Sequence, residues 1–151
     1  MKRAWALSVV AISLASTARA GDLSNSIGPA YIAEDLVGIN YERSISHWFC
    51  LDALAASSGD IDFGGVRLVL SRAEPSFQIR PSLGICMVRG KTDEGDPDPH
   101  TPWFGFLWPS LGMHGSKGHF AGTIDLGLIY GNTGDEDEAY GVLSASLMYR
   151  F

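Results

Sequence analysis

The last eleven residues, GVLSASLMYRF (141–151), carry the pattern that decides the fold. Leu143, Leu147, Tyr149 and Phe151 alternate there with a second set that includes Ser144, Ser146 and Arg150. Alternation with period two predicts a β-strand with one apolar face, because successive side chains of a strand point to opposite sides. The strand would run to the final aromatic residue, without the polar tail that most termini have.

The N-terminal residues predict export. Lys2 and Arg3 precede a short apolar run over residues 4–15, and Ala18-Arg19-Ala20 supplies small residues around a cleavage site. This order is typical of a secretory signal peptide, and the run is too short for a transmembrane helix. We therefore expect a signal peptide at 1–20, cleavage between Ala20 and Gly21, and one mature domain over 21–151.

Composition excludes one class of partner. The sequence has 17 acidic and 11 basic residues, and three of the basic residues belong to the predicted signal peptide. Nucleic acid is not an expected partner, because phosphate binding needs clustered Lys and Arg.

The mature chain divides into eight segments with strand periodicity, and no helical periodicity appears. The predicted strands are 26–33, 36–45, 48–58, 60–72, 77–89, 101–113, 119–130 and 139–151. Pro81 and Pro109 fall inside the fifth and sixth strands, where a residue without an N–H interrupts the hydrogen-bonded ladder. The sixth strand is apolar on both faces, which leaves its orientation open.

Connections of two kinds alternate between these strands. SISH, AEPS and HGSKG are short, whereas the other set includes the long acidic stretches KTDEGDPDPH and NTGDEDE. The acidic residues of this second set are Glu34, Asp35, Asp60, Asp93, Glu94, Asp96, Asp98, Asp135, Glu136, Asp137 and Glu138. Short periplasmic turns and longer outer loops are typical of outer-membrane barrels. The pattern predicts an all-β fold, an eight-stranded antiparallel up-and-down transmembrane β-barrel.

The terminal SASLMYRF resembles the C-terminal assembly signal of Gram-negative outer-membrane proteins, with Leu143, Leu147, Tyr149 and Phe151 at its apolar positions. With the eight strands and the signal peptide, the mature chain resembles the small OmpA/OmpX-like barrels. The resemblance implies a monomer in the outer membrane, in contact with lipid and lipopolysaccharide. It also implies recognition of the last strand by the barrel-assembly machinery.

Alternation also predicts what the barrel encloses. If Ile39, Tyr41, Phe49, Leu51, Val66, Leu68, Ile79 and Leu83 face lipid, then Glu42, Asp52, Arg67 and Arg80 face inward on four successive strands, with Asp125 farther round. An eight-stranded barrel has room only for packed side chains. Because buried charges without partners are costly, we expect a network of ion pairs that plugs the lumen.

Cys50 and Cys86 share the inward parity but lie at different heights along their strands. That difference exceeds the Cα–Cα distance of about 7 Å that a disulfide permits. The sequence therefore predicts two free thiols.

Aromatic residues are concentrated near the predicted strand ends. They are Tyr31, Trp48, Phe49, Phe77, Trp103, Phe120, Tyr130, Tyr140, Tyr149 and Phe151. This placement is typical of the aromatic girdles of membrane barrels.

His114-Gly115-Ser116 is the one motif that invites a catalytic interpretation, since some lipid A-modifying barrels use a His-x-Ser pair with a distant Glu. Activation of Ser by His needs a nearby acid. Here the motif falls in a predicted periplasmic turn without one, so we expect no catalytic residue. The dispersed His47, His100 and His119 predict no metal site, and no cofactor is expected. The acidic loops lack the calcium-loop pattern, so they are either simply solvated or bridge weakly to lipopolysaccharide through divalent cations.

We therefore expect a small outer-membrane barrel with a structural or surface-interaction role and no catalysis. Two alternatives stay open. One is a soluble periplasmic lipocalin-like binding barrel, and the other is a lipid A-modifying outer-membrane enzyme.

Overall fold

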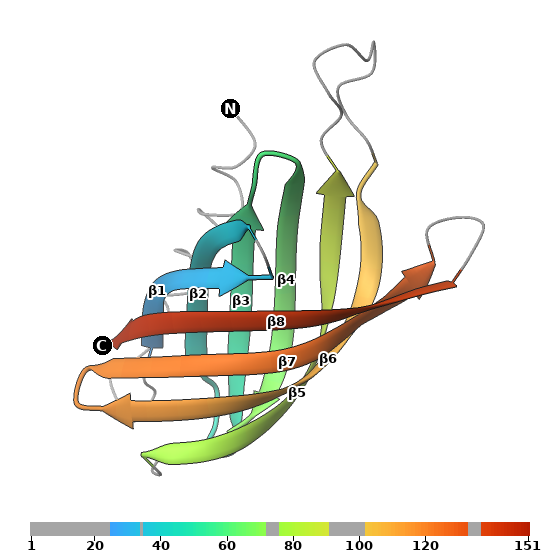
Figure 1. The fold of residues 1–151 in the computed structure, drawn as a ribbon. Helices are drawn as coiled ribbons and strands as arrows, with labels where there is room; N and C mark the ends of the chain where they lie inside the picture. Colours follow the sequence, from blue (N-terminus) through green and yellow to red (C-terminus); the bar gives the residue numbers. More distant parts are fainter. Residues whose placement is uncertain (1–24, 34, 72–75, 91–101, 133–136) are drawn as a thin grey trace.

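The fold is a closed barrel of eight antiparallel strands. The computed structural model describes residues 25–33, 35–71, 76–90, 102–132 and 137–151 (Figure 1). The strands are β1 (Asn25–Ile32), β2 (Leu36–Ser44), β3 (Phe49–Ser57), β4 (Ile61–Leu70), β5 (Phe77–Gly90), β6 (Phe104–Lys117), β7 (Phe120–Asn132) and β8 (Asp137–Arg150). Each strand pairs with its neighbours in sequence, and β8 pairs with β1. The predicted fold class is confirmed. The predicted signal peptide, with its Ala20–Gly21 cleavage site, lies outside the described residues.

The described ranges contain no helix long and apolar enough to cross a membrane. The acidic stretch KTDEGDPDPH (91–100) falls outside them, and so does NTGDEDE (132–138) except for Asn132, Asp137 and Glu138.

Seven of the eight predicted strands agree with the observed strands within two residues at each end, and the sixth was predicted wrongly. It was expected to end at residue 113, but β6 continues to Lys117, and His114 pairs with Thr123 of β7. The turn is confined to Gly118 and His119, because Gly118 adopts a positive φ of 60°. Only such a backbone angle, which glycine adopts without strain, reverses the chain over so few residues.

The prolines lie where the ladder is already interrupted or ended. Around Pro109, the pairing of β6 with β7 passes from Leu107–Tyr130 directly to Ser110–Gly127. Pro81 lies just beyond the last pair of β4 with β5, Val69–Ser82. A missing N–H therefore removes little from either ladder.

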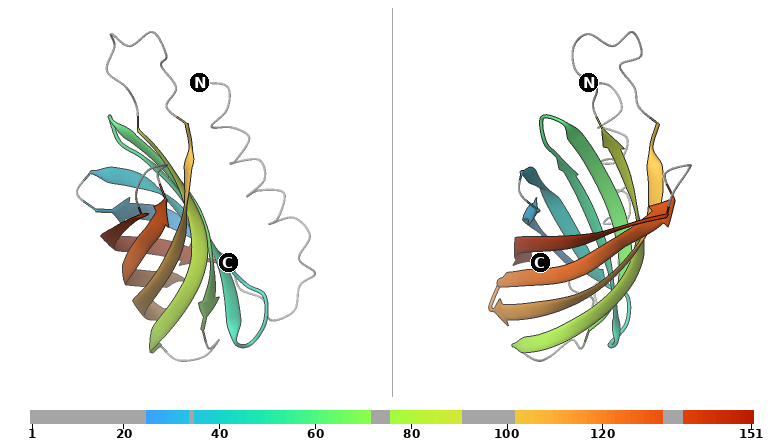
Figure 2. Two further views of the ribbon diagram at one scale, coloured as in Figure 1. Left: turned by 90° about the vertical axis from the view of Figure 1, so that its right-hand side faces the viewer. Right: turned by 45° about the vertical axis from the view of Figure 1, so that its right-hand side comes forward.

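The strands differ in length in a way that shapes the barrel. β1 to β4 contain 8 to 10 residues, whereas β5 to β8 contain 13 or 14. The long strands sweep across one side of the molecule and extend past the shorter ones (Figure 2). β1 ends at Ile32, opposite Ser144, although β8 begins at Asp137.

Candidate functional site

The outer face of the barrel is apolar. Leu126, Ile85, Leu111 and Leu147, on β5 to β8, and Ile39, on β2, are each more than half exposed. The predicted outward residues Ile39, Phe49, Val66, Leu68, Ile79 and Leu83 are exposed, and Leu51 is half-buried. Tyr41 differs, because it is buried and its hydroxyl donates a hydrogen bond to Asn25 Oδ1 at 2.9 Å. A soluble barrel would have polar side chains on this face.

All ten aromatic residues of the predicted girdles are exposed. Trp48, Phe49, Phe77, Phe120, Tyr149 and Phe151 lie toward the short turns, and Tyr31, Trp103, Tyr130 and Tyr140 lie toward the opposite rim. Tyr140 differs from the others in orientation. It pairs with buried Ile129 and so belongs to the inward-facing positions of β8, but it is exposed because it lies at the rim. The two groups flank the aliphatic part of the outer face.

The half of the interior nearest the short turns holds two buried arginines. We call this region the ionic half: Glu42, Asp52, Arg67, Arg80, His114 and Asp125. Arg67 Nε donates to Asp52 Oδ2 at 2.9 Å, and its Nη2 approaches Asp125 Oδ2 at 3.4 Å. Arg67 Nη1 donates to Ser110 Oγ at 2.9 Å. One guanidinium thus joins β4 to β3, β6 and β7 across the lumen.

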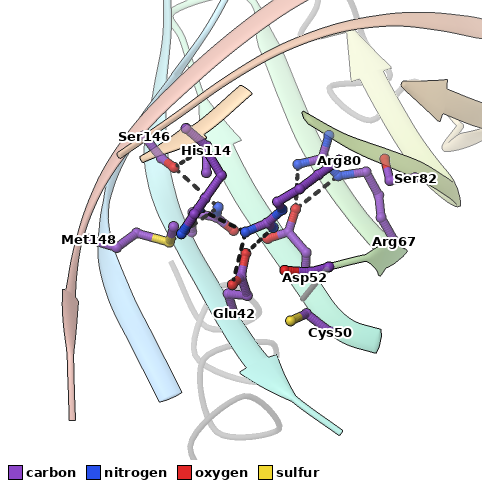
Figure 3. Close-up of polar contacts among 12 residues, drawn as sticks. Glu42, Cys50, Asp52, Arg67, Arg80, Ser82, His114, Ser146 and Met148 are labelled. Carbon is purple, nitrogen blue, oxygen red and sulfur yellow. Dashed lines mark hydrogen bonds and ion pairs between the residues drawn. The ribbon is translucent and has the colours of Figure 1, made fainter. Parts of the chain in front are cut away.

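Arg80 makes the second connection. It forms an ion pair with Glu42, with Nη1 3.2 Å from Oε1, and the same Nη1 donates to His114 Nδ1 at 2.8 Å (Figure 3). Since a guanidinium only donates, Nδ1 of His114 must be the acceptor nitrogen of the ring. The five residues named from sequence, Glu42, Asp52, Arg67, Arg80 and Asp125, are all buried and all engaged in these contacts.

Sequence reasoning missed His114, because the sixth strand was expected to end at residue 113, four residues before its observed end at Lys117. Extending the alternation of β6 past Met113 would have put His114 on the inward face with Ser110 and Gly112. It also missed Asn40, which is buried on β2 and donates to Ser146 Oγ at 3.4 Å.

The other half of the interior is apolar. The apolar half consists of Ala30, Ile32, Leu54, Ala56, Phe63, Cys86, Phe106, Trp108, Ile129 and Val142. Trp108 is 1% exposed and packs edge-on against Phe63, with ring centroids 5.2 Å apart. Cys86 belongs to this half, whereas Cys50 lies beside Ser44 near the short turns, 3.6 Å from its hydroxyl oxygen. Both thiols are free and buried.

The arrangement limits the chemistry of the interior. The one acceptor nitrogen of His114 is occupied by Arg80, so the ring is not placed to take a proton from Ser116. Within the described ranges, no three His, Cys, Asp or Glu side chains lie together so as to hold a metal ion.

Comparison with solved structures gives a match in fold. The chain is similar to the N-terminal β-barrel domain of OprF from Pseudomonas aeruginosa, with a TM-score of 0.64 and 11% sequence identity; the match covers 85% of this chain and 96% of that one. The outer membrane protein Ail of Yersinia pestis aligns with a TM-score of 0.48 and 18% identity, over 85% of this chain and 98% of that one. No family model and no curated protein sequence matches the chain. The predicted resemblance to small eight-stranded barrels is confirmed at the level of fold.

Proposed function

We propose that this protein is a small integral outer-membrane β-barrel with a structural or surface-interaction role and no catalysis. One observation carries the proposal: the apolar and charged sides of the strands are inverted relative to a soluble barrel. Leu126 is 66% exposed on the outer face, whereas Arg67 is 3% exposed inside. Burying a guanidinium while exposing leucine is favourable only where hydrocarbon surrounds the wall.

Closure of the barrel supports a membrane location. Phe151 and Asn25 exchange two backbone hydrogen bonds, of 2.9 and 3.0 Å, where β8 meets β1. In hydrocarbon an open edge leaves backbone groups without partners, so a spanning sheet has to close on itself. We infer that the chain reaches the outer membrane after Sec-type export and signal-peptide cleavage, and that lipid and lipopolysaccharide surround the monomeric barrel.

We infer that the last strand is what the barrel-assembly machinery reads. Leu143, Leu147, Tyr149 and Phe151 lie on one face of β8, and all four are exposed. A continuous apolar face on the terminal strand is available for recognition before the barrel closes.

The interior supports a plug rather than a channel. Ion pairs fill the ionic half and large side chains fill the apolar half, so we infer that the lumen does not conduct ions. The same packing opposes the lipocalin-like alternative, which needs a ligand cavity inside and a polar surface outside. The contact of His114 with Arg80 opposes the lipid A-modifying alternative.

Fractionation tests the proposal. We expect the protein in the outer-membrane fraction, extracted only by detergent, with migration on unboiled gels that changes on heating. In planar bilayers the purified barrel should show no channel conductance, and an open porin should conduct under the same conditions. Recovery of the protein in periplasmic shock fluid would refute the membrane location, and steady conductance would refute the plug.

A further inference from the structure

An apolar hollow crosses the outer wall of the barrel. Its volume is about 660 Å³, and its lining residues lie on β5 to β8 and on the adjoining β1 and β2. Phe77, Met113 and Leu147 belong to its lining, and each of these side chains is half exposed or more. The hollow therefore opens on the face that the proposed function places in lipid.

Small residues on neighbouring strands create the hollow. Gly115 of β6 pairs with Gly122 of β7, and both line it. A Cβ atom added to Gly115 would lie 3.8 Å from Ser76 O. One added to Gly122 would lie 3.7 Å from Ser146 O, which is again an ordinary van der Waals distance. Packing within the wall therefore does not require either glycine, and the space outside them is open to another molecule.

An acyl chain suits a hollow of this shape. Lipid tails surround the wall of a membrane barrel, and an unfilled gap beside protein atoms forfeits van der Waals contacts. A chain lying in the hollow contacts protein on its sides as well as beneath it. A chain on the neighbouring flat wall contacts protein along one side only. We therefore expect a chain in the hollow to be held more tightly than its neighbours.

The two rims of the barrel carry different charges. The turn between β6 and β7 lies at the same end of the barrel as the C-terminus (Figure 1). Arg43, Lys117 and Arg150 lie at this end, together with the α-carboxylate of Phe151. Among the described residues, the acidic side chains outside the ionic half lie at the opposite rim: Asp35, Asp60, Asp62, Asp137 and Glu138. Basic side chains near a membrane surface attract anionic lipid headgroups.

Lys117 places one of these basic groups at the end of the hollow. It lies two residues beyond Gly115 on the same face of β6, which is about 6–7 Å along the strand. Its side chain is exposed. A lysine at the end of a membrane segment extends its ammonium group toward the headgroups. A phosphate above a chain in the hollow is then within its reach.

We propose that the hollow binds one anionic phospholipid of the periplasmic leaflet, with an acyl chain across Gly115 and Gly122 and the phosphate beside Lys117. The inference rests on the proposed outer-membrane location and adds a specific lipid partner to it. The short turns of such barrels face the periplasm, so the basic rim meets the periplasmic leaflet. Lipopolysaccharide has its phosphates in the other leaflet, beside the acidic rim.

A second copy of the chain fits the hollow poorly. Two copies in one membrane share an orientation, so a two-fold pairing sets the same surface of each against the other. Hollow then faces hollow, and Lys117 faces its counterpart at the same depth. Such an interface leaves space unfilled and brings like charges together, and both effects are unfavourable.

Native mass spectrometry of the refolded full barrel tests the inference. The probes are dipalmitoyl phosphatidylglycerol and dipalmitoyl phosphatidylcholine, supplied in equal amounts in mixed micelles. They share their chains and phosphate, and only phosphatidylglycerol has a net negative charge. We expect one phosphatidylglycerol to be retained about fivefold more often than phosphatidylcholine, as one lysine beside an anionic lipid supports. Equal retention, or a spread of adducts without a dominant single lipid, would overturn the proposal.

Variants at two positions separate the chain from the headgroup. Gly122→Leu fills the hollow, so it should lower the retention of both lipids. Gly64→Leu is the matched control, because Gly64 lies on β4 outside the hollow and an added Cβ atom meets nothing within 4 Å. Lys117→Gln should abolish the preference for phosphatidylglycerol, and Lys117→Arg should keep it. Unchanged retention in Gly122→Leu, or an unchanged preference in Lys117→Gln, would refute the site.

The inference remains testable if Gly122→Leu fails to fold. Gly115→Leu then fills the same space from β6, where an added Cβ atom also has room. Lys117→Gln changes an exposed side chain and tests the headgroup contact without altering the hollow.

The outcomes also separate this inference from the proposed function. A barrel that is heat-modifiable and detergent-extracted but shows no lipid preference refutes the lipid site alone. A soluble periplasmic protein refutes the membrane location, whatever lipid it retains. Retention of lipid A in place of phosphatidylglycerol in equimolar competition would refute the choice of leaflet. A dimer that is lost in Gly122→Leu would show that a second copy occupies the hollow.

Discussion

The guanidinium carbon of Arg67 lies 4.2 Å from the centroid of the Trp108 ring, at the boundary between the ionic and apolar halves of the interior. The cation stacks on the indole and at the same time bonds Asp52. Cation–π contacts that are removed from water contribute up to about 2 kcal/mol. This contact joins the charged layer of the interior directly to its apolar layer.

Space for Trp108 of β6 is provided by a glycine on β4. A Cβ atom added to Gly65 would lie 2.8 Å from Trp108 Cζ3, whereas one added to the adjacent Gly64 meets nothing within 4 Å. We predict that Gly65→Ala lowers the free energy of unfolding by about 1–3 kcal/mol through overpacking. Urea unfolding of the barrel in lipid vesicles measures this loss.

Gly64→Ala is the matched control and should leave the urea midpoint nearly unchanged. In a Trp108→Leu background, the added loss from Gly65→Ala should shrink, because the clashing ring is gone. An equal loss in both backgrounds would show that Trp108 is not what occupies the space beside Gly65.

Breaking the buried Arg80–Glu42 ion pair should lower the free energy of unfolding more than breaking the partly exposed Asp62–Arg89 pair. Arg80→Met leaves the Glu42 carboxylate buried without its cation, and removing one partner of a buried pair costs about 3–5 kcal/mol. The double variant Arg80→Met with Glu42→Gln should recover part of that loss, since no buried charge is then left over. Urea midpoints of the single and double variants measure the coupling.

Asp62–Arg89 provides the comparison, because its side chains are 20% and 27% exposed. Asp62→Asn should cost no more than about 1 kcal/mol, as is usual for partly exposed pairs. Equal losses of unfolding free energy for the two pairs would mean that water reaches the ionic half as freely as it reaches the outer rim.

The strand count, the faces and the charged residues of the interior could be predicted because alternation fixes them locally. The inward orientation of Arg67 and Arg80 follows from the alternation alone, as does the exposure of Leu126. Which acid each arginine selects could not be predicted, since that depends on the register of strands far apart in sequence. The boundary of β6 was missed because Gly115 and Ser116 are typical turn residues, whereas pairing with β7 keeps them extended.

The apolar half could not be predicted either. Trp108 lies in a segment with large side chains on both faces, so alternation gives no orientation there. The orientation of Trp108 is determined by the register of β4, β5 and β6, which places its ring beside Gly65 and Phe63. Alternation within one strand does not contain this register.

Inward and outward positions of β7 should respond differently to arginine. Leu126→Arg places a cation on the outer face and should cost about 2–4 kcal/mol if residue 126 lies near the membrane midplane. Thr123 is inward and bonds Ser146 through its hydroxyl, and Asp125 on the same strand offers an acceptor for a new cation. Folding yields in lipid vesicles of both variants check this. Equal effects at both positions would contradict the assignment of faces.

Variants of the terminal residue, Phe151, can distinguish the stability of the folded barrel from its assembly in cells. Phe151 is 60% exposed, and its backbone forms two hydrogen bonds with Asn25. Phe151→Ala keeps those bonds and removes a partly buried ring, so the loss should stay below the roughly 1.5–3 kcal/mol of a fully buried aromatic. Deletion of Phe151 also removes the two bonds, and the rest of the β1–β8 ladder remains.

We therefore predict that both Phe151 variants refold into detergent or lipid with near-normal stability but accumulate poorly in the outer membrane of cells. The reason is that the Phe151 ring is only partly buried in the folded barrel, so its loss should change stability little. A machinery that recognises the end of β8 would instead contact the ring directly. Urea midpoints in vitro are compared with outer-membrane yield in vivo for both variants. An Ile85→Ala variant, which removes apolar area from the outer face of β5 and leaves the last strand unchanged, serves as the control for a general loss of apolar area. Normal outer-membrane yield from both Phe151 variants would show that the terminal residue contributes packing alone.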